Sequence, residues 1–67
     1  MGILADDIRP DHRVIFDWIE PKARVLDLGC GGGELIDLLS REKDARVQGI
    51  ELDEKAIWEC VRKGLSV

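Results

Sequence analysis

Apolar residues recur at helical intervals in three segments of this chain, and a short segment of strand-like pattern separates each one from the next. The helical spacing predicts helices over residues 11–19, 33–43 and 54–63. Residues 24–28 predict a strand, because a short apolar run bounded by glycines is typical of a buried strand, and residues 46–52 predict a second strand from an imperfect alternation of apolar and polar residues.

Each predicted helix has one apolar stripe, which we expect to face a shared core. The stripes consist of Val14, Ile15, Trp18 and Ile19, then Leu35, Ile36, Leu38 and Leu39, then Ala56, Ile57, Cys60 and Val61. The first predicted helix has Asp11 as its N-cap and is ended by Pro21, and the last predicted helix has Asp53 as its N-cap and Gly64 as its C-terminal cap. In the strands, Val25, Leu26 and Leu28 are expected in the core, and Gly49 indicates a close backbone approach.

The alternation of helix and strand predicts an α/β fold with a parallel sheet and right-handed crossovers. Such sheets are covered on both faces, and two strands are too few for a core. Residues 65–67 resemble the opening of a third strand. We therefore interpret residues 1–67 as the N-terminal part of a Rossmann-like, doubly wound domain, incomplete and with a loose lead-in over 1–10. Uncovered apolar faces and open sheet edges predict self-association of this fragment.

Composition narrows the class of partner and the compartment. The 67 residues are 45% hydrophobic and 36% charged, with a formal net charge of −4, as in an ordinary globular protein. A net negative charge argues against a nucleic-acid partner, and no apolar run approaches the ~20 residues of a membrane span. No targeting signal is recognisable, so we expect a cytoplasmic protein. Cys30 and Cys60 have no metal-type spacing with His12, so we expect two reduced thiols, no metal site and a solvated His12.

The segment RVLDLGCGGGELIDLL places a glycine-rich turn between a predicted strand and a predicted helix, an arrangement that brings a ligand to a helix N-terminus. A phosphate-binding P-loop needs Lys and Ser or Thr after its last glycine, but Glu34 and Leu35 follow Gly33. A dinucleotide fingerprint fits Gly29 and Gly31 but meets Glu34 at its third glycine. A nicotinamide-dependent enzyme is therefore a weaker interpretation.

The pattern that fits is acid-x-Gly-x-Gly-x-Gly, formed by Asp27, Gly29, Gly31 and Gly33. It resembles the first motif of the class I S-adenosylmethionine-dependent methyltransferases. S-adenosyl-L-methionine carries a sulfonium and an ammonium against one carboxylate, so an acidic loop attracts it. The resemblance implies that Asp27 supports the loop near the methionine amino group. It also implies that the backbone of Gly29–Gly33, including Cys30, faces the methionine moiety.

A second acid, Glu51, ends the second predicted strand at about the 20-residue spacing at which a carboxylate meets ribose hydroxyls. A carboxylate accepts both hydroxyl protons in charge-assisted hydrogen bonds. The resemblance assigns Glu51 to the ribose and Leu52 to the border of the adenine. Asp53 is interpreted first as a helix cap.

A narrower resemblance covers roughly residues 11–67, including the segments DWIEP and RKGLSV: the chain resembles the MetW methionine-biosynthesis proteins. This family is methyltransferase-like and linked to homoserine acetylation and methionine synthesis. The resemblance implies the cofactor-binding half of a methyltransferase-like protein in methionine biosynthesis. The alternative is a non-catalytic regulator with a homoserine acetyltransferase as partner. No residue of the chain is singled out as a catalytic base.

Overall fold

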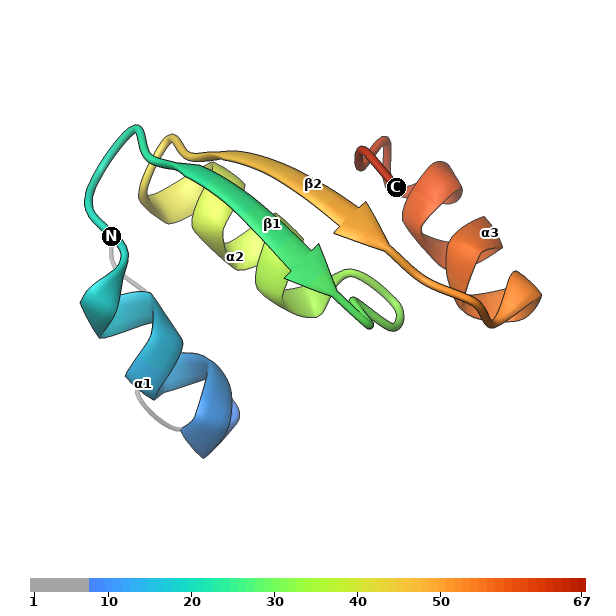
Figure 1. The fold of residues 1–67 in the computed structure, drawn as a ribbon, viewed down its shortest axis with the longest axis horizontal. Helices are drawn as coiled ribbons and strands as arrows, with labels where there is room; N and C mark the ends of the chain where they lie inside the picture. Colours follow the sequence, from blue (N-terminus) through green and yellow to red (C-terminus); the bar gives the residue numbers. More distant parts are fainter. Residues whose placement is uncertain (1–7) are drawn as a thin grey trace.

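Three helices alternate with two strands along residues 8–67, the part of the chain that the computed structural model describes (Figure 1). The elements are α1 (Pro10–Trp18), β1 (Arg24–Leu28), α2 (Glu34–Glu42), β2 (Arg46–Ile50) and α3 (Glu54–Arg62). The strands pair in parallel, with Arg24 beside Arg46 and Leu28 beside Ile50. The predicted Rossmann-like alternation with a parallel strand pair is confirmed. Residues 1–7 of the predicted lead-in lie outside the described residues.

Helix α1 begins one residue earlier than predicted, at Pro10. Proline suits a first helical position because its ring presets φ and its missing N–H needs no partner there. Arg9 is the N-cap residue and makes no side-chain capping bond, so the assignment of Asp11 as N-cap was wrong. Asp11 lies in the first turn, where its negative charge complements the helix dipole.

Strand β2 ends at Ile50, two residues before its predicted end. The cause is the Glu51 side chain, whose Oε2 accepts the backbone N–H groups of Leu52 at 3.1 Å and Asp53 at 2.9 Å. These bonds turn the chain away from the sheet and into α3.

Both predicted ends of α3 are confirmed. The Asp53 carboxylate accepts the Ala56 N–H at 3.1 Å, as expected of an N-cap. After the helix, Gly64 adopts a left-handed φ of 74°. Its N–H donates to Val61 O, and the Leu65 N–H donates to Cys60 O. These two bonds form a Schellman motif, which requires a left-handed residue at the position of Gly64.

The core lies between α2 and one face of the sheet (Figure 1). All four predicted core residues of α2 are buried: Leu35, Ile36, Leu38 and Leu39. At Gly49 on β2, an added Cβ would lie 2.6 Å from Ile36 Cδ1, which confirms the predicted close approach. The helix therefore packs directly on the strand backbone.

The prediction that Leu26 and Leu28 lie in the core was wrong, since their exposed fractions are 58% and 71%. Successive strand side chains point to opposite faces. Val25 and Asp27 share the face covered by α2, whereas Leu26 and Leu28 point to the other face. Within residues 8–67 no helix covers that second face (Figure 1).

The apolar face of α1 differs from the predicted stripe. Ile15, Phe16 and Ile19 pack against the core, whereas Val14 and Trp18 are exposed. The face that meets α2 is therefore rotated about the helix axis from the one we expected.

Helix α3 buries only part of its predicted stripe. Cys60 is fully buried, Ala56 and Ile57 are half-buried, and Val61 is 49% exposed. A helix that meets its neighbours along one narrow line buries a single row of side chains.

Residues 65–67 do not form the regular third strand that the sequence suggested. The Gly49 N–H of β2 nevertheless donates to Ser66 O at 2.9 Å, and the Ser66 hydroxyl donates to the Gln48 side chain. The segment thus lies against the free edge of β2. Among the described residues, no helix is long and apolar enough to cross a membrane.

Candidate functional site

The glycine loop, residues 29–33, connects the carboxyl end of β1 to α2. The Gly29 N–H donates to Ile50 O at 2.7 Å, which ties the loop to the end of the neighbouring strand. Gly33 has a φ of 87°, and an added Cβ would clash with Leu65 and lie 2.9 Å from Cys60 Sγ. Both its conformation and its surroundings therefore require glycine at position 33.

Space for a ligand lies beside the other loop glycines. An added Cβ at Gly29, Gly31 or Gly32 would meet nothing within 4 Å. A cavity of about 260 Å³ lies between the loop, the start of α2 and the first turn of α1. Its lining outside the loop consists of Arg9, Asp11, His12, Ile15, Asp27, Glu34 and Leu35.

Asp27 lies in this cavity lining, on the face of β1 that α2 covers. Burial raises the pKa of its carboxyl group. The negative charge of Glu51 adds to the effect, and His12 opposes it. Within residues 8–67 the Asp27 carboxylate forms no ion pair. A half-buried carboxylate without an ion-pair partner is stabilised by a cationic ligand group.

Glu51 follows β2 and accepts three backbone N–H groups, those of Leu52 and Asp53 at Oε2 and that of Gly31 at Oε1, at 2.7 Å. These hydrogen bonds to the charged form hold the pKa of Glu51 below its ordinary value. The carboxylate thus joins the glycine loop to the start of α3. Three bonds leave part of its acceptor capacity for a ligand hydroxyl.

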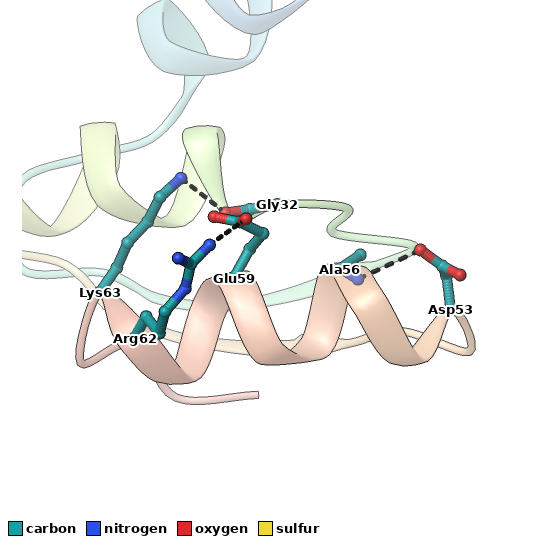
Figure 2. A network of polar contacts seen from close by, with 6 residues as sticks. All are labelled: Gly32, Asp53, Ala56, Glu59, Arg62 and Lys63. Carbon is teal, nitrogen blue, oxygen red and sulfur yellow. Dashed lines mark hydrogen bonds and ion pairs between the residues drawn. The ribbon is translucent and has the colours of Figure 1, made fainter.

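The end of α3 holds the loop from a second direction (Figure 2). The Lys63 ammonium donates to Gly32 O at 2.8 Å, and the Cys60 thiol donates to Gly31 O at 3.3 Å. Sequence reasoning missed this role of Lys63, because a lysine at the end of a helix also fits a dipole contact. Lys63 and Gly32 are 31 positions apart in the sequence, so no local pattern indicates their contact.

Two further predicted site residues, Cys30 and Leu52, have surroundings that differ from those of the loop glycines. Cys30 turns its thiol into the core, and burial together with hydrogen bonding to Cys60 raises its pKa to about 11. Cys30 is therefore unsuited to nucleophilic chemistry. Leu52 is 96% exposed and lies outside the cavity lining, next to Glu51.

The first turn of α1 adds three residues that sequence reasoning did not place in the site: Arg9, Asp11 and His12. His12 was expected to be solvated, but it is half-buried and lines the same cavity as Asp27. Spacing along the chain gives no signal for this contact, which depends on how α1 folds back beside the loop.

The site as a whole suits a cationic ligand better than a phosphate. A phosphate cradle needs free loop N–H groups, but the Gly31 N–H is bonded to a carboxylate. Within residues 8–67 the cavity lining holds three carboxylates, Asp11, Asp27 and Glu34, and its one arginine, Arg9, is paired with Asp11. Among residues 8–67 no cluster of three or more His, Cys, Asp or Glu residues is arranged to hold a metal ion.

Known proteins match most of this chain. A ubiquinone biosynthesis O-methyltransferase of Paracidovorax citrulli (strain AAC00-1) is 42% identical over 62 residues, covering 81% of this chain and 26% of that protein. A ribosomal protein L11 methyltransferase of Burkholderia mallei (strain NCTC 10229) is 38% identical over 52 residues, covering 72% of this chain and 17% of that protein. The chain thus spans about a quarter or less of the length of these relatives.

The family model described as "Methionine biosynthesis protein MetW" matches residues 9–67. The match includes α1, the glycine loop, both strands and α3. Because it covers nearly the whole chain, and because the relatives are methyltransferases, the chain belongs to the MetW family, within the class I methyltransferases.

Proposed function

We propose that this chain forms the S-adenosylmethionine-binding part of a methyltransferase-like protein that acts in methionine biosynthesis. The observation that carries the proposal is the open space over Gly29, Gly31 and Gly32 beside Asp27, a half-buried carboxylate without an ion-pair partner. S-adenosylmethionine brings a sulfonium and an ammonium, and their charge compensates that carboxylate.

Each residue of the site has a role in this proposal. Asp27 accepts a hydrogen bond from the ammonium, and the backbone of residues 29–33 faces the methionine moiety. Glu51 uses its remaining acceptor capacity for a ribose hydroxyl, and Leu52 borders the adenine. The bound cofactor supplies an electrophilic methyl group.

The contribution of this chain to methyl transfer is binding and orientation. Glu51 and Lys63 hold the loop in one conformation before the ligand arrives, so less ordering accompanies binding. The names of the two relatives refer to unrelated molecules, ubiquinone and ribosomal protein L11. Their similarity to this chain therefore supports a shared cofactor-binding part, and we assign recognition of the methyl acceptor to residues outside that part. The family description supports a place in methionine biosynthesis.

Calorimetric titration with S-adenosylmethionine tests the proposal. We expect saturable binding by the wild type, at least tenfold weaker binding by Asp27→Asn, and unchanged binding by the control Glu42→Gln, which lies at the far end of α2. No heat from the wild type, or equal affinity in Asp27→Asn, would contradict the assignment. Tight binding of NADH instead would favour a nicotinamide-dependent protein.

A growth assay tests the link to methionine. A strain that lacks the protein should require added methionine, and the wild-type gene should restore growth without it. Growth of the deletion strain at the normal rate in methionine-free medium would remove this part of the proposal.

A further inference from the structure

Basic side chains gather at the amino end of the sheet, opposite the end that holds the glycine loop. Arg24 and Arg46 are the first residues of β1 and β2, and they are partners in the strand register. Adjacent strands lie about 4.8 Å apart, so the two arginines start from neighbouring positions on one face of the sheet. Lys22 lies just before β1. A second cavity, of about 460 Å³, is lined by these three cations together with Asp44 and Ala45.

The three cations differ from other basic residues of the chain in having no ion-pair partner. Arg41 and Arg62, for example, each pair with an acid on their own helix. Lys22, Arg24 and Arg46 are exposed and form no ion pair within residues 8–67. Like charges at directly opposite positions destabilise a strand pair. An anionic group between the two arginines therefore offsets a repulsion that the fold itself leaves in place.

The backbone around this cavity is fixed by an unusual pair of turns. Among residues 8–67, Lys22 and Asp44 are the only non-glycine residues with a left-handed φ, at 66° and 51°. Such conformations persist where the surrounding contacts determine them. The Lys22 N–H donates to Lys43 O at 2.7 Å, and the Arg46 N–H donates to Ala23 O at 2.8 Å. The turns before the two strands are thus bonded to each other, and the cavity walls are formed before a partner binds.

We propose that Lys22, Arg24 and Arg46 form a docking surface for an acidic segment of a partner protein. Exposed charges attract a single small ion only weakly, because water and salt screen them. A segment with several carboxylates contacts all three cations at once, and each arginine fork matches the two oxygens of a carboxylate. Asp44 in the same lining and the net charge of −4 are unfavourable for nucleic acid, whereas a protein surface has charges of both signs.

The docking surface is separate from the ligand site. In doubly wound sheets ligands bind at the carboxyl ends of the strands, where the glycine loop lies. None of the three cations lines the cavity beside that loop. We therefore expect the partner to bind whether or not the loop is occupied, and substitutions of Arg24 and Arg46 to leave S-adenosylmethionine binding unchanged. The inference does not depend on the proposed function.

Fluorescence anisotropy with a labelled hexaglutamate peptide tests the proposal. We expect saturable binding in about 50 mM NaCl that weakens about fivefold or more in about 300 mM NaCl, and no binding of a hexaglutamine peptide. Arg24→Gln with Arg46→Gln should weaken binding by about tenfold or more, whereas Arg24→Lys with Arg46→Lys should keep part of it. The control is Arg13→Gln with Lys55→Gln, which removes the same charge from exposed positions outside the cavity.

Thermal melting shows whether each variant is folded, and the melting temperature should rise in Arg24→Gln with Arg46→Gln because the repulsion is removed. Absence of peptide binding by the wild type, unchanged binding in that double variant, or equal weakening in the control would overturn the proposal. Tighter binding of a single-stranded oligonucleotide would overturn it in favour of nucleic acid. Displacement of the peptide by low millimolar inorganic phosphate would overturn it in favour of a small anion.

Discussion

Three glycines of one loop allow backbone strain, steric clash and ligand contact to be measured separately. Gly32 has an ordinary φ and open space, Gly29 has a left-handed φ of 72° and open space, and Gly33 has a left-handed φ and no space. Alanine therefore adds neither cost to the fold at Gly32, backbone strain at Gly29, and both backbone strain and steric clash at Gly33.

The expected costs follow from these surroundings. Gly32→Ala should change the free energy of unfolding by less than about 0.5 kcal/mol, because the methyl group meets nothing. Gly29→Ala should cost about 1–2 kcal/mol, the penalty of a left-handed residue with a Cβ. Gly33→Ala carries the same penalty and also overpacks against Leu65 and Cys60, which adds about 1–3 kcal/mol.

Urea unfolding followed by circular dichroism measures all three differences, and calorimetry with S-adenosylmethionine adds a second scale. The stability order should be Gly32→Ala, then Gly29→Ala, then Gly33→Ala. Affinity should fall already in Gly32→Ala, because Gly32 lines the cavity in which we propose that the ligand binds. A Gly33→Ala variant as stable as Gly29→Ala would refute the packing of α3 and the C-terminal segment against the loop. Unchanged affinity in Gly32→Ala would refute the ligand position.

Four further outcomes are expected. Asp53→Ala should lower stability by about 1 kcal/mol in urea unfolding, because the N-cap bond of α3 is lost, whereas Asp53→Asn should keep most of it. Asp27→Asn should raise stability at neutral pH: the raised pKa of Asp27 means that its stability contribution falls as pH rises from about 4 through the folded-state pKa. A wild-type-like pH profile in that variant would contradict this. Cys30 and Cys60 should react slowly with iodoacetamide until urea exposes them, since both are buried. Fast native labelling would disprove that burial. The 67-residue chain should self-associate through the sheet face that carries Leu26 and Leu28, which no helix among residues 8–67 covers, and Leu28→Lys should shift sedimentation toward the monomer.

Local sequence patterns were sufficient to predict most helices and strands, but they did not indicate which face of each packs against the core. Helix α2 and the caps of α3 were predictable because an amphipathic stripe, an Asp and a Gly are each readable within a few residues. For α1, two sets of residues are compatible with helical spacing: the predicted set of Val14, Ile15, Trp18 and Ile19, and the observed set of Ile15, Phe16 and Ile19. Only packing on α2 selects the observed set. In β1 the run of apolar residues indicates burial on both faces, but a helix among residues 8–67 covers one.

In the candidate site too, local sequence patterns were sufficient to find residues but not their contacts. The contacts of Asp27 and Glu51 determine how substitutions of these two acids should be interpreted. Asp27 and Glu51 were both recognisable from their places after or within a strand, but the bonds from Gly31, Leu52 and Asp53 to Glu51 were not. Those bonds lower the pKa of Glu51, so its ionised form stabilises the fold above its unfolded pKa, and this contribution is lost as pH falls through the folded-state pKa.

Burial raises the pKa of Asp27, whereas hydrogen bonding lowers that of Glu51. Neutral substitution at Glu51 should therefore lower stability at pH 7, and neutral substitution at Asp27 should raise it. Loss of ligand binding in a Glu51 variant is ambiguous, because a loosened loop has the same effect as a lost ribose contact. Loss of binding in a stabilised Asp27→Asn variant has no such second explanation, because the loop remains folded. Asp27, rather than Glu51, is therefore the residue whose substitution decides whether this loop binds a cationic ligand.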